Sequence, residues 1–463
     1  MKELETLDIA FLKRYDTPGP RYTSYPTAPA FSSDFEKEAF RRAVLKNNQQ
    51  NPEGDLSLYF HIPFCDTLCY FCGCTMLVTR DPDKIERYLK ALMAELNLVH
   101  PLLSDRRKVC QLHLGGGTPS YLSPDQVRRM MENVHKLFSQ TSPDAEFGVE
   151  IDPRGLTHGH MRAFRETGFN RVSMGIQDFD EEVQKAVNRI QPFTITKQAI
   201  DWCRELGFQS INVDLIYGLP FQKPETFEST LERVIELAPE RIAVFNFAFV
   251  PWLKPHQRVI PKEALPNLDT KLSLLKLAIE TLSRAGYVYI GMDHFAKPGD
   301  ELAVAQAKGD LHRNFQGYST KAHADLYAFG MSSISQFGNV YAQNEKNISK
   351  YESTVLEGNL ATTVGYTLNR DDEIRRFTIM RLMCTMDLDK QEVERRFEIK
   401  FNSYFSEALE KLIPFQQEGL IDLREDRIVV HPLGRLIVRN VAMCFDAYLE
   451  RLLKEKPIFS RTV

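Results

Sequence analysis

Three cysteines in one short run are suited to hold an iron–sulfur cluster. Cys65, Cys69 and Cys72 lie in the segment HIPFCDTLCYFCGC with the spacing C-x3-C-x2-C. Three thiolates can ligate three irons of a [4Fe–4S] cluster and leave the fourth iron open, whereas an electron-transfer cluster takes four cysteines. Cys74 could instead complete the sulfur ligands of a structural zinc site, although such sites usually use paired C-x2-C elements or cysteine–histidine sets. The spacing favours the open cluster.

The cysteine run resembles the signature of the radical S-adenosylmethionine (SAM) superfamily. In that superfamily the methionine amino and carboxylate groups chelate the open iron, and one electron from the cluster cleaves the sulfonium bond. A second segment, GGGTP at residues 115–119, is a turn in which glycines let a ligand approach the backbone closely. Alone it indicates only a tight turn, but after a cysteine loop it resembles the superfamily's GGE-type motif, which binds the methionine amino group.

Strand-like and helix-like segments alternate along the part of the chain that carries these motifs. The strand-like segments are rich in Val, Ile, Leu and Phe, as strands buried on both faces should be. We expect six βα units in a parallel sheet with right-handed crossovers, closed as a partial (β/α)6 barrel within an α/β fold. The functional face should lie at the carboxyl ends of the strands, by analogy with full barrels. The six predicted strands are 56–60, 109–114, 147–151, 170–174, 209–216 and 242–247.

Polar residues stand at the ends of several predicted strands. Glu150 ends the third, Gln177 follows the fourth and Asp214 lies in the fifth, while Tyr59 and His61 share one face of the first. One buried carboxylate is more often a satisfied structural acid than a ligand. Several at successive strand ends indicate a binding site at the barrel mouth.

Two regions flank the predicted barrel of residues 55–370. Residues 1–54 contain the segment GPRYTSYPTAPAF, whose prolines exclude a regular helix, so we expect an extended arm with two tyrosines free to be exposed, then a helix over about 33–46. Residues 371–463 read as helices, then strand, turn, strand and helix, which predicts a small, mostly helical, winged-helix-like domain. Without a basic excess, this domain should act as a substrate lid or a packing unit rather than bind nucleic acid.

Composition bounds the partners and the compartment. The formal net charge is −4, so nothing favours a polyanion, and basic runs are short. The amino-terminal residues lack the apolar core of a signal peptide, and no apolar stretch approaches the ~20 residues of a membrane span. We expect a cytoplasmic monomer, since an oxygen-sensitive cluster and scattered free cysteines suit a reducing compartment.

Motifs over nearly the whole chain resemble one family, the oxygen-independent coproporphyrinogen III oxidases, also called coproporphyrinogen dehydrogenases. The resemblance implies oxidative decarboxylation of two propionates of coproporphyrinogen III to vinyl groups without O2, giving protoporphyrinogen IX in heme synthesis. It also implies two bound SAM molecules, an electron donor such as a flavodoxin- or ferredoxin-like protein, and an electron acceptor that the sequence does not identify. The motifs are GPRYTSYPTA, HIPFC-x3-C-x-FC-x-C, LHLGGGTP, EIDPR, RVSMGIQDF, VNRIQP, NVDLIYGLP, RNFQGYST and GRLIVRNVAMCFD.

The same resemblance assigns residues to the cofactors. Cys65, Cys69 and Cys72 would hold the cluster, and the first SAM would lie at Tyr59, Gly116 and Glu150. The second SAM is implied at Phe71, Gly117, Thr118, Gln177, Arg189, Asp214, Ala248 and Ile334. The candidate catalytic residues are Tyr59, Cys74 and Gln316, with Cys74 near the cluster but not a ligand.

Candidates for the substrate side are Arg21, Tyr22, Tyr25 and Arg313. The substrate carries four carboxylates, which arginines bind well, although either arginine could equally be structural. The alternative function is that of a sister radical SAM family that binds and delivers heme. The RYTSYPTA arm and Cys74 argue against it, because that family starts close to the first strand and carries an aromatic residue at the position of Cys74.

Overall fold

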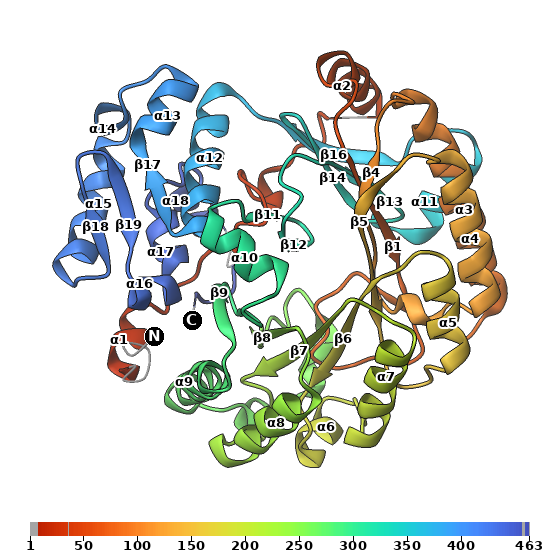
Figure 1. The fold of residues 1–463 in the computed structure, drawn as a ribbon, viewed down its shortest axis with the longest axis horizontal. Coiled ribbons are helices and arrows are strands. Elements are labelled where there is room, and N and C mark those ends of the chain that lie inside the picture. Colours follow the sequence, from red (N-terminus) through yellow and green to blue (C-terminus); the bar gives the residue numbers. More distant parts are fainter. Residues whose placement is uncertain (1–7, 36, 456–458, 463) are drawn as a thin grey trace.

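The computed structural model describes residues 8–35, 37–455 and 459–462. Its central feature is a twelve-stranded mixed sheet in the order β16-β15-β14-β13-β1-β4-β5-β6-β7-β8-β10-β9 (Figure 1). Six neighbouring strands of this sheet pair in parallel, in chain order, and coincide with the six predicted strands, so that prediction is confirmed. They are β1 (Leu56–Ile62), β4 (Val109–Gly116), β5 (Thr141–Ile151), β6 (Arg171–Gln177), β7 (Ser210–Tyr217) and β8 (Arg241–Asn246).

Helices on the outer side of the curved sheet follow the strands (Figure 1). They start where the sequence favours it: Ser123 caps α4 in a capping box with Gln126, and Pro124 occupies the first turn. Helix α4 buries Val127 and Met131 against the sheet, as its apolar periodicity requires. The outer helices are α3 (Pro82–Val99), α4 (Pro124–Leu137), α5 (His158–Glu166), α6 (Glu181–Ala186), α7 (Phe193–Glu205) and α8 (Pro224–Leu237).

The other six strands of the sheet were not predicted from the sequence. β13 (Asp325–Phe329) pairs in parallel with β1. Beyond it, three strands continue the sheet in antiparallel pairing, and two more close the opposite edge next to β8. These are β14 (Ile334–Phe337), β15 (Val340–Asn344), β16 (Thr362–Thr367), β10 (His294–Ala296) and β9 (Val288–Gly291). The further helices α9 (Leu268–Arg284), α10 (Glu301–Lys308) and α11 (Ile348–Leu356), with the hairpin β11 (His312–Asn314) and β12 (Gly317–Ser319), lie in the same part of the chain.

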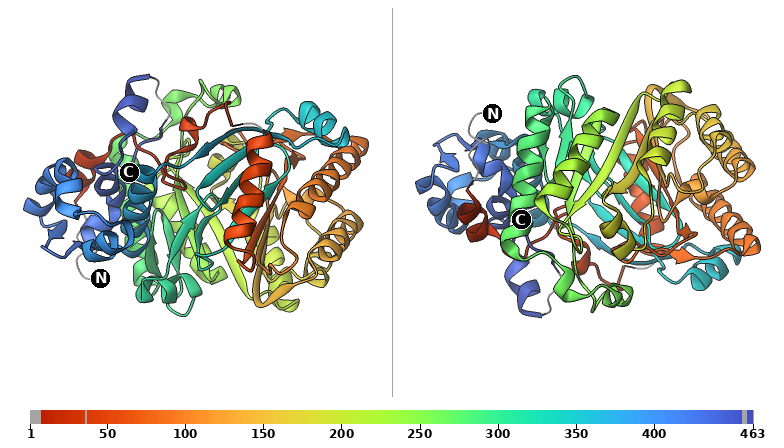
Figure 2. Two further views of the ribbon diagram at one scale, coloured as in Figure 1. Left: turned by 90° about the horizontal axis from the view of Figure 1, so that it is seen from above. Right: turned by 90° about the horizontal axis from the view of Figure 1, so that it is seen from below.

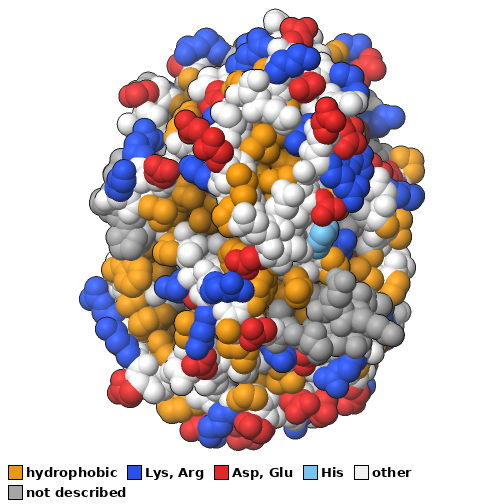
Figure 3. All heavy atoms as spheres, turned by 90° about the vertical axis from the view of Figure 1, so that its left-hand side faces the viewer, with side chains coloured by type: hydrophobic (Ala, Val, Ile, Leu, Met, Phe, Trp, Pro, Cys, Tyr) orange, Lys and Arg blue, Asp and Glu red, His pale blue; other side chains and the backbone are white. Residues whose placement is uncertain are grey.

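The carboxyl-terminal region lies beside the β9–β10 edge of the sheet (Figure 1). Its predicted hairpin is present as β18 (Ile421–Leu423) and β19 (Arg427–Val430), and an unpredicted strand, β17 (Asp387–Asp389), pairs with β19. Acidic and basic side chains are interspersed on the face that this region presents in Figure 3. Its helices are α12 (Arg370–Thr385), α13 (Lys390–Phe397), α14 (Phe401–Tyr404), α15 (Ser406–Gln417), α16 (Pro432–Leu436), α17 (Val438–Met443) and α18 (Leu449–Glu455).

The amino-terminal arm is packed against this region, and the expected exposure of its tyrosines is wrong. Tyr22 and Tyr25 are 1% and 0% exposed. The Tyr22 hydroxyl donates to Asp446 (2.9 Å), and the Tyr25 hydroxyl accepts from the Ala447 amide (3.0 Å). Both rings are buried because the proline-spaced segment lies directly on the carboxyl-terminal helices.

Two further details of the arm differ from the sequence expectation. A short helix that was not predicted, α1 (Ile9–Tyr15), precedes the proline-spaced segment, and the predicted helix runs as α2 (Lys37–Gln50), a few residues later than expected. The first and last described segments meet through the antiparallel bridge of Pro18 with Arg461 and so lie in one region of the molecule (Figure 2). Among the described residues, no helix is long and apolar enough to span a bilayer.

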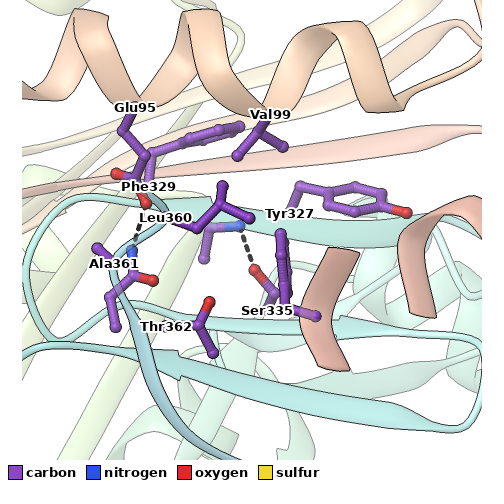
Figure 4. A pocket seen from close by; sticks show the side chains of 11 residues that line it. Glu95, Val99, Tyr327, Phe329, Ser335, Leu360, Ala361 and Thr362 are labelled. Atoms are coloured by element: carbon purple, nitrogen blue, oxygen red, sulfur yellow. Dashed lines mark hydrogen bonds between the residues drawn. The ribbon is translucent and has the colours of Figure 1, made fainter. Parts of the chain in front are cut away.

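A small pocket between α3 and the β13–β16 part of the sheet contains a buried acid. Figure 4 shows Glu95 and Val99 pointing from the helix toward the strands. The Glu95 carboxylate accepts hydrogen bonds from the Gly330 amide (2.7 Å), the Tyr351 hydroxyl (2.7 Å) and the Asn344 amide group (2.5 Å). Burial nevertheless raises its pKa to about 7.

Candidate active site

The three cysteines of the predicted cluster site lie on a loop that leaves the carboxyl end of β1. The loop is pinned at its base by the two-residue strands β2 (Phe64–Cys65) and β3 (Leu77–Val78). Cys69 is buried, Cys65 and Cys72 are half-buried, and Cys74 is exposed. The Thr118 hydroxyl of the GGGTP turn lies 3.3 Å from the Cys65 sulfur, so the two predicted motifs are in contact.

The thiols of the loop are close enough to influence each other's ionisation. Burial raises the pKa of Cys65 to about 11, and the neighbouring thiols of Cys72 and Cys69 add to the effect. A hydrogen bond from Cys74 lowers the pKa of Cys72 to about 6, and the nearby Lys254 and His256 side chains lower it further. Ionised thiols this close together repel one another, and bound metal cations would relieve that repulsion. An iron–sulfur cluster would do so by binding each sulfur through a different iron atom.

Among the described residues, no group of three or more His, Cys, Asp or Glu side chains could hold a single metal ion.

Two arginines contact the sulfur of Cys69. Arg154 and Arg189 point guanidinium nitrogens at the Cys69 sulfur, at 3.4 and 3.7 Å. Both also pair with Asp152, at 2.7 and 3.0 Å. Burial alone would raise the pKa of Asp152, but the two guanidiniums hold it below its usual value, so this acid stays ionised.

A loop after β8 supports the cysteine loop through its backbone. His256 lies 2.8 Å from the Cys72 carbonyl, Lys254 donates to the Cys74 carbonyl (2.9 Å), and Gln257 donates to the Phe71 carbonyl (3.2 Å). Gln257 also donates to the carbonyl of Ala248 (3.1 Å), one of the predicted SAM residues. The sequence analysis missed these three side chains because main-chain acceptors leave no residue pattern that could have identified them.

The predicted first SAM residues meet at the mouth of the site, at the carboxyl ends of the parallel strands. Glu150 accepts from the Gly116 amide (3.1 Å) and lies 3.3 Å from His113 Nε2. The Tyr59 ring stacks on His113 with 6.1 Å between centroids, and its hydroxyl lies 3.1 Å from His61 Nδ1. The interactions with His113 and the Gly116 amide outweigh burial, so the pKa of Glu150 falls below its usual value and the carboxylate is charged.

The turn that carries Gly116 needs its glycines. Gly116 has φ +117°, a conformation that other residues rarely adopt. A Cβ on Gly117 would lie 2.7 Å from the Pro63 carbonyl carbon and oxygen, in the backbone of the cysteine loop. The glycines thus let this turn pack against the cysteine loop.

A second group of predicted residues surrounds Arg189. Its Nη2 donates to the Gly175 carbonyl (2.7 Å). Its Nε and the Oε1 of Gln177 are buried and find no hydrogen-bond partner among the described residues. Burial raises the pKa of Asp214, which accepts a hydrogen bond from Asn212 (2.9 Å), to about 7. Unpartnered polar atoms in a buried group of this kind suit a polar ligand.

The remaining predicted SAM residues approach the mouth from different elements. Phe71 is on the cysteine loop and packs on the small cluster of Val183, Val187 and Leu219. Ile334 begins β14, which runs antiparallel to β13 and so starts at the carboxyl end of the parallel strands. Sequence reasoning thus selected residues that the fold brings to one end of the sheet.

A cavity of about 230 Å³ with many polar lining residues runs along the inner face of the parallel strands. It extends from the mouth toward the hairpin β11–β12, where Gln316 lies in the turn with its buried Nε2 unpartnered among the described residues. Arg313 of β11 lies over the Tyr318 ring, 4.7 Å from its centroid, and Arg21 of the arm lies over Phe245 at 5.4 Å. Residues that line the cavity include Glu150, Asp214, Phe245, His294, Gln316 and Tyr318.

Comparisons with known proteins agree with this geometry. Residues 59–234 match the Radical SAM superfamily, and residues 368–437 match the HemN C-terminal domain. The fold and the cysteine site are therefore those of a radical SAM protein.

Similarity over the full length is more specific. The chain is 48% identical to an oxygen-independent coproporphyrinogen III oxidase of Salmonella typhimurium, and the match covers 98% of each sequence. The corresponding protein of Synechocystis is 45% identical over 98% of this chain and 97% of its own. The solved structure of coproporphyrinogen III oxidase (HemN) from Escherichia coli superposes with a TM-score of 0.91 at 47% identity, covering 96% of this chain and 99% of that one. The chain belongs to the family of oxygen-independent coproporphyrinogen III oxidases.

Proposed function

We propose that this protein converts coproporphyrinogen III to protoporphyrinogen IX without O2, as a step of heme biosynthesis. The observation that carries the proposal is that the GGGTP turn contacts both the cysteine loop and Glu150, and that Glu150 lines a polar cavity. Family membership over nearly the whole chain supports the same reaction.

The cysteine loop would hold the cluster, with Cys65, Cys69 and Cys72 as its ligands. Cys74 is exposed and hydrogen-bonds Cys72, which suits a role beside the cluster rather than on it. When bound, the cluster and SAM supply one-electron chemistry that produces a carbon radical able to remove hydrogen from an unactivated C–H bond. Glu150 would accept from the ammonium group of the first SAM, beside Tyr59 and Gly116.

A second SAM would occupy the site around Arg189. Its unpartnered Nε and the unpartnered Oε1 of Gln177 are a donor and an acceptor for a polar ligand, and Asp214 offers a carboxyl group for ribose hydroxyls. Phe71, Gly117, Thr118, Ala248 and Ile334 would complete this site. This second molecule is the part of the proposal that most needs a direct test.

The substrate would enter the cavity with its reacting propionate toward the mouth. For each propionate, the side chain loses one hydrogen atom, one electron and CO2, and becomes a vinyl group; the electron passes to an acceptor. Tyr59, Cys74 and Gln316 are the candidate catalytic side chains. Tyr59 and Cys74 would lie near the reacting propionate, and Gln316 would contact the substrate from the turn between β11 and β12. Arg21 and Arg313 would bind carboxylates, whereas the buried Tyr22 and Tyr25 would act by holding the arm in place.

The wider organisation follows the same proposal. We assign residues 1–54 to an arm, 55–370 to a partial barrel with its extension, and 371–463 to a winged-helix-like unit. A flavodoxin- or ferredoxin-like protein would supply electrons, and the protein would act as a monomer.

The test is anaerobic incubation of the cluster-loaded protein with SAM, a low-potential reductant, an electron acceptor and coproporphyrinogen III. Each vinyl group formed should release one CO2 and yield one 5′-deoxyadenosine and one methionine. Chromatography of the porphyrins, after oxidation, reads the product. A protein that leaves coproporphyrinogen unchanged and instead binds heme stoichiometrically would favour the heme-delivery alternative.

A further inference from the structure

Three arginines from three distant segments converge beside the cavity. Arg21 comes from the arm, Arg313 from β11 and Arg439 from α17. Arg313 and Arg439 are 3% and 4% exposed. Arg21 pairs with Asp293 at 2.7 Å. The negative charge of Asp293 also favours the charged forms of Arg313 and Arg439.

Two of these guanidiniums lack partners for part of their donors. Nε and Nη1 of Arg313 and Nη1 of Arg439 are buried without a hydrogen-bond partner among the described residues. Arg439 donates through its Nη2 to the carbonyls of Arg461 (3.0 Å) and Thr462 (2.5 Å). Burying a cation with unsatisfied donors is costly, so such an arrangement in a folded protein indicates a missing anion.

The electrostatics of the neighbourhood agree with an excess of positive charge. Burial, followed by the Arg21 guanidinium, lowers the pKa of Arg439 to about 10. Burial and then Arg313 lower the pKa of His294 to about 4, so this histidine is neutral. Among the described residues, Asp293 is the acid that favours the charged forms of Arg313 and Arg439, and a single carboxylate cannot neutralise three guanidiniums.

The arginines adjoin the cavity through its aromatic wall. Arg313 lies over Tyr318, and Arg21 lies over Phe245, both of which line the cavity. His294 packs edge-on against both of these rings, so the two arginines flank one aromatic patch. An anionic group on a ligand in the cavity could therefore reach the arginines past this wall.

We propose that Arg439, together with Arg313 and Arg21, binds a propionate carboxylate of the porphyrinogen, so that the carboxyl-terminal region supplies part of the substrate site. This inference rests on the proposed function and deepens it, because Arg439 lies outside every segment assigned to cofactors or substrate. A guanidinium offers paired donors that match a carboxylate. The porphyrinogen carries four such groups.

The first test measures binding of coproporphyrin III, the oxidised analogue with the same four propionates, to the cluster-loaded protein by fluorescence titration. Arg439→Gln and Arg313→Met should each weaken binding about 10- to 100-fold. Arg395→Met is the control, because that side chain is 68% exposed on α13 and should leave binding unchanged. The wild type should bind mesoporphyrin IX, which has two propionates, less tightly than coproporphyrin III. The ratio of the two affinities should be smaller in both variants.

The second test separates a ligand site from a structural role. Without ligand, Arg313→Met removes a buried charge that lacks partners, so its midpoint of thermal unfolding should rise by about 2–4 °C. A structural role predicts a lower midpoint. A lower midpoint with unchanged coproporphyrin binding in both variants would overturn the inference while leaving the proposed function intact. Failure of the wild type to bind coproporphyrin III and to convert coproporphyrinogen III would refute the proposed function itself.

Discussion

The buried carboxyl group of Glu95 makes stability depend on pH in a direction that can be worked out. Its ordinary pKa of 4.5 applies to the unfolded chain, and in the folded protein burial raises the pKa to about 7. The folded state therefore binds more protons than the unfolded state between these values, and stability falls as the pH rises from about 4.5 to 7. A difference between pKa values of 4.5 and about 7 corresponds to about 3 kcal/mol.

Glu95→Gln removes this titration while keeping the shape of the side chain. The variant should lose about 1–2 kcal/mol at pH 5, because the amide cannot accept all three hydrogen bonds that reach the carboxylate. Between pH 5 and pH 8 the free energy of unfolding of the wild type should fall, relative to the variant, by about 2.5 kcal/mol.

Urea-induced unfolding of the metal-free, reduced protein at several pH values measures this relative change. Glu86→Gln on the same helix is the control, since Glu86 is 46% exposed and pairs with Arg129 at the surface. The free energy of unfolding of Glu86→Gln should stay within about 0.5 kcal/mol of the wild-type value across this pH range. If the difference between the wild type and Glu95→Gln is also constant with pH, burial does not disfavour ionisation of this carboxyl group and the reasoning fails.

Three further predictions address the cofactor site and the arm. Cys69→Ala should abolish the visible charge-transfer absorbance of a reconstituted cluster, whereas Cys74→Ser should keep it. Equal loss of absorbance in both variants would contradict the argument for an open iron. Asp214→Ala should lower bound SAM from two molecules to one in equilibrium binding without changing the cluster spectrum; a wild-type stoichiometry of one would contradict the second site. Tyr22→Phe should destabilise the protein by about 1–3 kcal/mol in denaturant titrations, because Asp446 loses its buried donor, and a neutral effect would mean that this contact contributes nothing.

The sequence predicted the parts of the fold whose signals are local. The six parallel strands are apolar runs between amphipathic helices, and that alternation identifies each strand without knowledge of its neighbours. The six other strands of the sheet are short, and β13 is parallel to β1 although no βα alternation leads to it. Pairing over such a separation depends on tertiary packing, which no local pattern encodes.

The same division holds at the site. Spacing alone identified the cysteines, and the resemblance to a family identified Glu150 and Gly116, which the structure places in contact. The burial of Tyr22 depends on Asp446, more than four hundred residues away, so its side chain could be taken for an exposed one. Arg439 lies within the motif GRLIVRNVAMCFD, but the motif assigns it no role, and only the assembled fold reveals its unpartnered donor.

The position of β1 between β4 and β13 has a consequence for synthesis of the chain. One edge of β1 pairs with residues made soon afterwards, but the other edge waits for β13, because Leu56 pairs with Asp325. At ribosomal speeds of about 5–20 residues per second, that edge stays open for roughly 15–50 s. During this interval the nascent chain presents an unpaired strand next to its cysteine loop. We therefore expect metal loading to follow translation of β13, and chaperones that shield strand edges to act before it.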